Sequence, residues 1–228
     1  YDQDVDALNE PDRPIPSGRV PGKTAFWFAV VWTVIAQTWA ILLGPWVAAA
    51  TGLGLALAWA YSAPPLRLKM NGWWGNSAVA ISYEGLAWIT GAAIVIGGDL
   101  PAEPILLIAL LYSIGAHGIM TLNDFKSVEG DLAMGIRSLP AQLGPTRAAR
   151  VACLFMLLPQ LIVILLLVRW GLMPSALAVS LMVVAQLLAM RKLLRDPKQF
   201  APWYNATGVS LYVLGMMAVA IGLGGWLA

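Results

Sequence analysis

The stretch "TAFWFAVVWTVIAQTWAILLGPWVAAATGLGLALAWAYSAPPL", from Thr24 to Leu66, contains no Asp, Glu, Lys or Arg. Further uncharged stretches cover residues 151–168, 170–190 and 199–228. A helix needs roughly 20 apolar residues to cross the hydrocarbon core of a bilayer, which is about 30 Å thick. The chain has 228 residues, of which 59% are hydrophobic and only 11% are charged. We therefore expect an integral membrane protein surrounded by the lipid bilayer.

Proline and glycine divide the apolar stretches into helices. "LGPW", from Leu43 to Trp46, makes the first stretch a hairpin, because proline lacks an N–H donor and disfavours helix in the residue before it. "SAPPL" and "GGDLPAEP" end the next two helices. The expected fold is all-α, a polytopic transmembrane helical bundle that forms one domain over residues 1–228. Its spanning helices, about seven, are expected at 24–43, 47–63, 74–97, 104–122, 148–168, 172–190 and 203–226.

The basic residues predict the orientation of the bundle. If both acidic segments face the cytoplasm, every Lys and Arg except Arg169 lies on that side, as the positive-inside rule requires. We therefore expect loops 1–23, 64–73 and 123–147 to form a cytoplasmic mouth. The net charge of +2, without a basic stripe, excludes a nucleic-acid partner.

Acids gather in two segments, "YDQDVDALNEPDRPIPSGR" (residues 1–19) and "HGIMTLNDFKSVEGDLAMGIRS" (residues 117–138). Residues four or seven apart share one face of a helix, where like charges repel unless a cation lies between them. Carboxylate oxygens are the ligands that Mg²⁺ prefers, together with waters and substrate phosphates. The alternative is that loop acids only keep the rim of a membrane protein hydrated. We predict a Mg²⁺ site built from Asp2, Asp6, Asp124, Glu129 and Asp131.

Basic and hydroxyl side chains near these acids predict an anionic partner, a diphosphate. Arg67 and Lys69 follow a predicted helix closely, with Tyr61 and Ser62 as neutral donors. Arginine offers a planar fork that matches phosphate oxygens, whereas lysine gives a mobile point charge. The alternative is that basic loop residues only meet anionic lipid headgroups. Further candidates for substrate binding are Arg13, Ser17, Lys126, Arg137 and Ser138.

Two ionisable residues lie within predicted helices. Glu84 is near the middle of the membrane, where a charge is costly and marks a functional site by default. His117, the only histidine, could ligate a metal, accept a proton or link helices by a hydrogen bond, and the structural role is the default. We include both as candidates for substrate binding.

Several motifs resemble those of the UbiA-type membrane prenyltransferases. "YDQDVD" is similar to the end of their first motif, Asn-Asp-x-x-Asp-x-x-x-Asp, with Asp2 and Asp6 on its last two aspartates. "DLAMGIRS" is similar to their second, Asp-x-x-x-Gly-x-x-Ser, although Ser127 stands where much of the superfamily has another Asp. "RPIPSG", "YSAPPLRLK", "NGWWGN" and "NDFKSVEGD" resemble the chlorophyll synthase branch, and "SYEGLAW" resembles its bacterial members.

The resemblance implies a reaction and a location. Members of this branch transfer a geranylgeranyl or phytyl group from its diphosphate to the propionate of a chlorophyllide, here bacteriochlorophyllide a. They have nine transmembrane helices, so one to two helices would precede Tyr1. The implied location is the inner or intracytoplasmic photosynthetic membrane of a bacterium. Association with other pigment-biosynthesis or photosynthetic membrane proteins stays open.

The resemblance also implies roles for particular residues. A Mg²⁺ cofactor held by the aspartates would neutralise the leaving diphosphate. The basic side chains would stabilise the charge that develops as the allylic bond breaks. The implied catalytic residues are Asp2, Asp6, Asp124, Asp131, Arg67 and Lys69. His117 could then ligate the central magnesium of the pigment.

Two other functions remain open from the sequence. A quinone- or haem-type prenyltransferase would transfer the chain to carbon. A transporter would use Glu84 and His117 as an ion path, although such proteins place their acids near the midplane.

Overall fold

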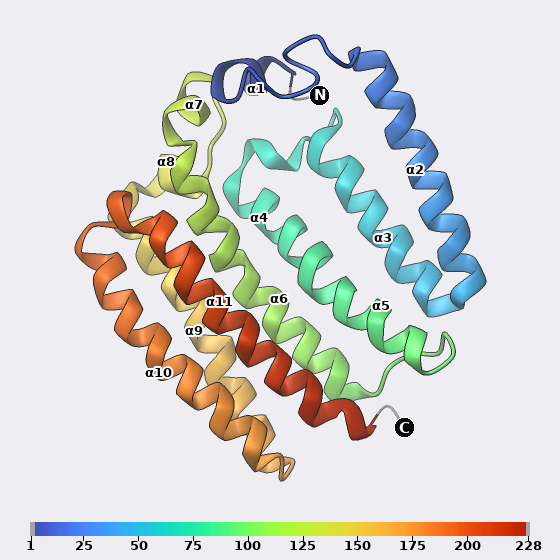
Figure 1. Cartoon of the computed structure of the whole chain (residues 1–228), viewed down its shortest axis with the longest axis vertical. Helices are drawn as coiled ribbons and strands as arrows, with labels where there is room; N and C mark the ends of the chain where they lie inside the picture. Colours follow the sequence, from blue (N-terminus) through green and yellow to red (C-terminus); the bar gives the residue numbers. More distant parts are fainter. Residues whose placement is uncertain (1–2, 227–228) are drawn as a thin grey trace.

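The computed structural model describes residues 3–226, and within this range every regular element is a helix. Seven long helical segments run side by side along the bundle (Figure 1). They are α2 (Gly22–Leu43), α3 (Pro45–Ser62), α4 with η2 and α5 (Gly72–Ala80, Ile81–Gly85, Leu86–Val95), α6 (Glu103–Asn123), α9 (Pro145–Arg169), α10 (Met173–Arg195) and α11 (Pro197–Leu223). The predicted all-α bundle is confirmed.

Short helices close the two ends of the bundle. One end carries α1 (Gln3–Asn9), η1 (Leu68–Met70), η3 (Asp124–Lys126), α7 (Val128–Ala133) and α8 (Leu139–Leu143). In Figure 1 the helices α1, α7 and α8 lie together at this end, so segments that are far apart in the sequence meet there. The other end holds the α2–α3 and α9–α10 turns and η4 (Gly224–Trp226).

Six of the segments are long and apolar enough to cross a membrane, namely α2, α4–α5, α6 with η3, α9, α10 and α11. The protein is accordingly a multi-pass membrane protein. Helix α3 has 18 residues and is not among the six. It packs between α2 and α5 as part of the same bundle.

Helix α6 is the central element of the core. It packs against α4, α9 and α11, and about two thirds of its most apolar window is buried. Tyr212 of α11 donates a hydrogen bond to the carbonyl oxygen of Tyr112 in α6, at 3.2 Å. Between α9 and α10, Gln160 and Gln186 exchange two amide hydrogen bonds of 3.1 and 3.0 Å. Such pairing satisfies polar groups that hydrocarbon would leave without a partner.

The spanning helix expected over 74–97 is present as Gly72–Val95 and contains a π-helical turn at Ile81–Gly85. This turn inserts an extra residue between α4 and α5, and π-bulges frequently mark functional sites. Hydrophobic spacing does not distinguish such a turn from an α-helix, so the sequence carries no sign of it.

The close approach of α6 and α9 at Gly118 leads to a stability prediction. A Cβ atom at this position would lie 2.4 Å from the carbonyl oxygen of Ala152 and 2.8 Å from Cγ of Met156. We expect Gly118→Ala to destabilise the protein by about 1–3 kcal/mol, the usual cost of overpacking a core. The measurement is the thermal unfolding midpoint in detergent.

Gly91 of α5 provides the matched control, because a Cβ atom there would meet nothing within 4 Å. Alanine forms helix better than glycine, so Gly91→Ala should leave the midpoint unchanged or raise it. Equal midpoints for Gly118→Ala and the unmodified protein would show that α6 and α9 separate more easily than this packing implies.

Candidate active site

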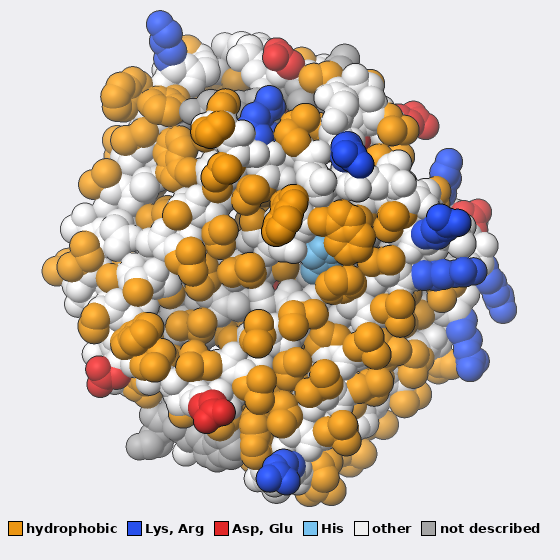
Figure 2. Space-filling view, turned by 180° about the vertical axis from the view of Figure 1, so that it is seen from behind, with side chains coloured by type: hydrophobic (Ala, Val, Ile, Leu, Met, Phe, Trp, Pro, Cys, Tyr) orange, Lys and Arg blue, Asp and Glu red, His pale blue; other side chains and the backbone are white. Residues whose placement is uncertain are grey.

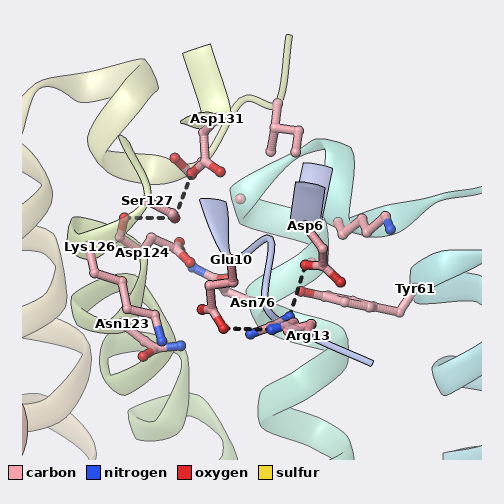
Figure 3. A pocket seen from close by; sticks show the side chains of 15 residues that line it. Asp6, Glu10, Arg13, Tyr61, Asn76, Asn123, Asp124, Lys126, Ser127 and Asp131 are labelled. Carbon is pink, nitrogen blue, oxygen red and sulfur yellow. Dashed lines mark hydrogen bonds and ion pairs between the residues drawn. The ribbon is translucent and has the colours of Figure 1, made fainter. Parts of the chain in front are cut away.

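A polar cavity of about 370 Å³ opens at the end of the bundle where α1, α4 and the α6–α8 segment meet (Figure 3). Three stretches of sequence supply its walls. The polar lining consists of Asp6, Glu10 and Arg13 from the first stretch, Tyr61, Lys69 and Asn76 from the second, and Asn123, Asp124, Lys126, Ser127, Asp131 and Ser138 from the third. Both acidic segments therefore reach one cavity.

The first wall is held together by Arg13. Its Nη1 lies 2.9 Å from Oδ1 of Asp6, and its Nε lies 2.6 Å from Oε2 of Glu10. Figure 3 shows the three side chains side by side at the cavity. The hydrogen bond that Arg13 donates to Glu10 and the negative charge of Asp6 raise the pKa of the Arg13 guanidinium. Ion pairs exposed to water contribute little stability, so these partners can be exchanged for a ligand at small cost.

The second wall is fixed by a backbone link to the third. The N–H of Gly72 donates to the carbonyl oxygen of Arg137 at 2.7 Å. The N–H of Arg137 donates to the carbonyl oxygen of Met70 at 3.0 Å. This approach requires glycine, because a Cβ atom on Gly72 would lie 2.5 Å from the nitrogen of Leu139. The link holds Lys69 at the cavity, where partial burial lowers the pKa of its ammonium group.

The third wall departs from the sequence prediction. Asp124 and Asp131 were expected on one face of a continuous helix. In the structure α6 ends at Asn123, and the helical conformation is interrupted at Ser127, between η3 and α7. Ser127 donates its hydroxyl to Oδ2 of Asp131 at 3.1 Å and also contacts the carbonyl oxygen of Asp124 at 3.2 Å. Both carboxylates still line the same cavity.

Several predicted residues do not line this cavity. Arg67 lies in the turn before η1 with φ at 40°, and Ser17 bonds to the carbonyl oxygen of Pro14. Arg137 takes part only through its backbone, in the link to Gly72 and Met70, and Glu129 is exposed on α7. Ser62 lines two neighbouring cavities instead. Asp2 lies outside the described residues, so its place in the site stays a prediction.

The two ionisable residues within the helices also lie elsewhere. His117 is 3% exposed, stacks on Phe155 at 4.5 Å between ring centroids and lies 5.6 Å from the Trp73 ring. Neither ring nitrogen has a hydrogen-bond partner among the described residues, so the structure does not show the helix-linking hydrogen bond that was the default expectation, and ligation of a pigment stays a prediction. Glu84 lies in the π-turn and lines a separate cavity of about 410 Å³ beside Trp88.

Neutral side chains are the functional candidates that the sequence did not reveal. Asn76 and Asn123 line the polar cavity, and Asn76 donates to Oδ2 of Asp124 at 3.0 Å. An uncharged amide carries no charge pattern that would single it out. The spacing within "NGWWGN" is the one available signal, since Asn71 caps α4 and Asn76 lies one turn further along.

Two further cavities adjoin the polar one. The larger, of about 660 Å³, is mainly apolar, lies between α1, α2 and α3 and shares Asp6 with it. The other, of about 550 Å³, has a mixed polar and apolar lining, lies between α3, α4 and α6 and shares Tyr61, Asn76, Asn123 and Asp124. The arrangement can hold a charged head group among polar side chains while apolar parts of a ligand extend into the bundle.

The acidic residues of the cavity fit a magnesium ion that a substrate helps to hold. Within residues 3–226, no three His, Cys, Asp or Glu side chains are grouped closely enough to hold a metal by themselves. Magnesium is usually bound through one or two carboxylates, with waters and substrate phosphates completing its shell. Asp124 and Asp131, with Asp6 across the cavity, provide such a partial set.

Comparison with known proteins identifies related chains. Bacteriochlorophyll synthase 33 kDa chain of Cereibacter sphaeroides is 55% identical over 224 residues, which cover 98% of this chain and 74% of the relative. Bacteriochlorophyll synthase 34 kDa chain of Chloroflexus aurantiacus is 49% identical, covering 97% and 71%. Chloroplastic chlorophyll synthase of Arabidopsis thaliana is 38% identical, covering 97% and 58%.

The fold has a counterpart among solved structures. A structure of digeranylgeranylglyceryl phosphate synthase superposes with a TM-score of 0.73 at 19% identity, covering 97% of this chain and 77% of the other. Similarity at this level of identity shows a common fold. Residues 1–211 match the UbiA prenyltransferase family. With this match over most of its length, and with relatives of up to 55% identity, the chain belongs to the UbiA prenyltransferase family.

Proposed function

We propose that this protein esterifies the propionate of bacteriochlorophyllide a with a geranylgeranyl or phytyl group taken from the prenyl diphosphate. The observation that carries the proposal is the identity of 49–55%, over nearly the whole chain, with chains named bacteriochlorophyll synthase. The family supports a prenyl diphosphate as donor, and the names of these relatives support the tetrapyrrole as acceptor.

The polar cavity is the proposed site of the diphosphate. Lys69, Arg13 and Lys126 supply positive charge at its walls, and Tyr61 supplies a neutral hydroxyl. Arg67 and Arg137 do not line the cavity, and their contact with the diphosphate stays a prediction. Donors placed in advance around a leaving group stabilise the charge that develops on it as the bond breaks.

Magnesium is the proposed cofactor, held by Asp124 and Asp131, by Asp6 across the cavity, and by Asp2. When bound, the ion would neutralise the diphosphate oxygens and so favour departure of the leaving group. Ser127 and Asn76 keep two of these carboxylates in place through the hydrogen bonds described above. Glu129 faces solvent in the structure, so we assign it no direct contact with the metal.

The transfer needs no general base. The allylic C–O bond breaks and its electron pair leaves with the diphosphate, while a propionate oxygen forms the new ester bond to the prenyl carbon. A carboxylate is already ionised at neutral pH, so no proton moves. This explains how a site without histidine can suffice. The two cavities beside α3 hold the prenyl chain and the macrocycle and keep water from the reactive carbon.

The proposed location is a bacterial inner membrane, with the polar cavity facing the cytoplasm. The helix ends around the cavity carry the basic residues, and Arg169 ends α9 on the opposite side. Figure 2 shows Lys and Arg gathered along one edge of the molecule, with hydrophobic side chains over most of the face. This asymmetry is the pattern that places a membrane protein with its basic end inward.

The two other functions raised by the sequence fit less well. A transporter would need its acids at the midplane, whereas Asp6, Asp124 and Asp131 line a cavity at one end of the bundle. A quinone- or haem-type enzyme would share this cavity, and the difference lies in the acceptor. The acceptor therefore has to be tested directly.

Replacing Asp124 by asparagine tests the reaction and the site together. Full-length protein in membranes is supplied with bacteriochlorophyllide a and geranylgeranyl or phytyl diphosphate, and esterified pigment is measured by chromatography. We expect ester formation that requires Mg²⁺ and that falls by about 100-fold or more in Asp124→Asn, because transition-state charge loses its counterion.

The control is Asp99→Asn, since Asp99 is exposed in the α5–α6 loop at the opposite end of the bundle. It should retain full activity. A contrary result would be that the protein forms no ester with either prenyl donor and instead prenylates a quinone precursor. That result would support a prenyltransferase activity and disprove the tetrapyrrole as acceptor.

The lowered pKa of Lys69 predicts a pH dependence of diphosphate binding. Because burial lowers this pKa, the empty site loses the lysine charge at a lower pH than an exposed lysine would. Affinity for inorganic diphosphate at saturating Mg²⁺ should therefore fall as pH rises through that pKa. The loss should reach about tenfold or more, since a hydrogen bond to a charged group contributes about 1.5–3 kcal/mol.

Lys69→Arg is the comparison, because arginine stays protonated throughout the range. Its affinity should stay constant while that of the unmodified protein declines, as measured by calorimetry. Parallel curves for the two proteins would show that Lys69 does not contact the diphosphate.

A further inference from the structure

Asn76 connects α4 to the end of α6 through a directed set of hydrogen bonds. Its side-chain amide nitrogen lies 3.0 Å from Oδ2 of Asp124 and 3.4 Å from Oγ1 of Thr121. The hydroxyl of Thr121 in turn donates to the carbonyl oxygen of His117 at 2.9 Å. Asn76 itself is 7% exposed, so these bonds form away from bulk water.

This set fixes which way the amide of Asn76 points. The hydroxyl hydrogen of Thr121 is already committed to His117, so its oxygen faces Asn76 as an acceptor. The NH₂ group of Asn76 must therefore point toward α6, and an ionised Asp124 can accept from it. With Oδ2 held in this way, the other carboxylate oxygen of Asp124 is left for the cavity.

Asn76 can hold Asp124 in place because its own helix is anchored. Asn71 caps α4 by accepting a hydrogen bond from the N–H of Trp73 at 2.9 Å. One residue further, Gly72 bonds to the backbone of Arg137 as described above. The start of α4 is thus attached to Arg137, which follows shortly after α7, the helix that carries Asp131. This attachment limits movement between the two sides of the cavity.

Ser127 does for Asp131 what Asn76 does for Asp124. Its hydroxyl lies 3.1 Å from Oδ2 of Asp131 and 3.2 Å from the carbonyl oxygen of Asp124, and the charged carboxylate is the stronger acceptor for the single hydroxyl hydrogen. The carbonyl oxygen of Ser127 accepts the N–H of Asp131 at 2.8 Å. Asp131 is 7% exposed, so a free rotation of its carboxylate would break a bond that water does not readily replace. Each of the two aspartates is therefore held by one neutral donor.

We propose that Asn76 and Ser127 are positioning residues that aim the carboxylates of Asp124 and Asp131 into the cavity, so that a divalent cation and a diphosphate bind there together. The inference rests on the proposed function, in that it takes this cavity as the site of the metal and the diphosphate. Partners that orient metal ligands typically change metal affinity by about 10- to 100-fold when they are removed.

The test measures metal binding without any pigment. Full-length protein in nanodiscs is titrated with Mn²⁺ in the presence of inorganic diphosphate, and free Mn²⁺ is followed by electron paramagnetic resonance. We expect Asn76→Leu and Ser127→Ala to weaken Mn²⁺ binding by about 10- to 100-fold. Ser127→Thr keeps the hydroxyl and should bind Mn²⁺ nearly as the unmodified protein does.

Gln160→Leu is the matched control for Asn76→Leu, because it also removes a buried side-chain amide but acts on the pair with Gln186 between α9 and α10, away from the cavity. It should lower the thermal midpoint and leave Mn²⁺ affinity unchanged. If Asn76→Leu does not fold, the Ser127→Ala and Ser127→Thr pair decides alone. Unchanged affinity in both Asn76→Leu and Ser127→Ala, or equal loss in Gln160→Leu, would overturn the inference.

The same proteins separate this inference from the proposed reaction. The unmodified protein could bind Mn²⁺ and diphosphate, and lose this binding in Asn76→Leu and Ser127→Ala, yet form no ester. That result would disprove the proposed acceptor and support the inference. Normal esterification, with the same Mn²⁺ affinity in Asn76→Leu, Ser127→Ala and the unmodified protein, would overturn the inference and leave the proposed reaction standing.

Discussion

The backbone link between Gly72 and Arg137 is the interaction on which the candidate site depends. It ties the start of α4 to the loop between α6 and α9, two parts of the chain that are more than sixty positions apart in sequence. Together with the hydrogen bonds from Asn76 to Asp124 and Thr121, it holds Lys69 and Asn76 on one side in a fixed relation to Asp131 and Ser138 on the other. The approach also needs a glycine at position 72, so one residue type allows two walls of the cavity to meet.

The membrane imposes the second constraint, and it explains why the site lies at one end of the bundle. A charge in hydrocarbon is costly, so acids and bases that bind a diphosphate belong at helix ends. The tail of a prenyl diphosphate, by contrast, is as apolar as the helices. A polar cavity at the helix ends with the two cavities beside α3 satisfies both halves of such a ligand.

Sequence patterns predicted much of this arrangement. Apolar segments divided at proline and glycine located all seven long helices, including the one that contains Glu84, and the clustering of acids predicted that Asp6, Asp124 and Asp131 would reach one end of the bundle. Patterns along the chain did not predict the break at Ser127 or the π-turn, because both depend on local hydrogen bonds rather than on hydropathy. They also missed Asn76, a neutral residue whose role arises only when α4 packs on α6. His117 and Glu84 are conspicuous in sequence but lie outside the polar cavity, since rarity within a membrane helix does not reveal which face a side chain occupies.

One cavity, formed where α1 meets the α6–α8 segment, is proposed to bind a divalent cation together with a diphosphate. The most direct measurement is a crystal structure of the full-length protein with Mn²⁺ and inorganic diphosphate, in which anomalous scattering locates the metal. We expect a peak in contact with Asp124 and Asp131, with diphosphate oxygens between the metal and Lys69. A metal and diphosphate bound elsewhere, with these side chains left as they are, would contradict this proposal.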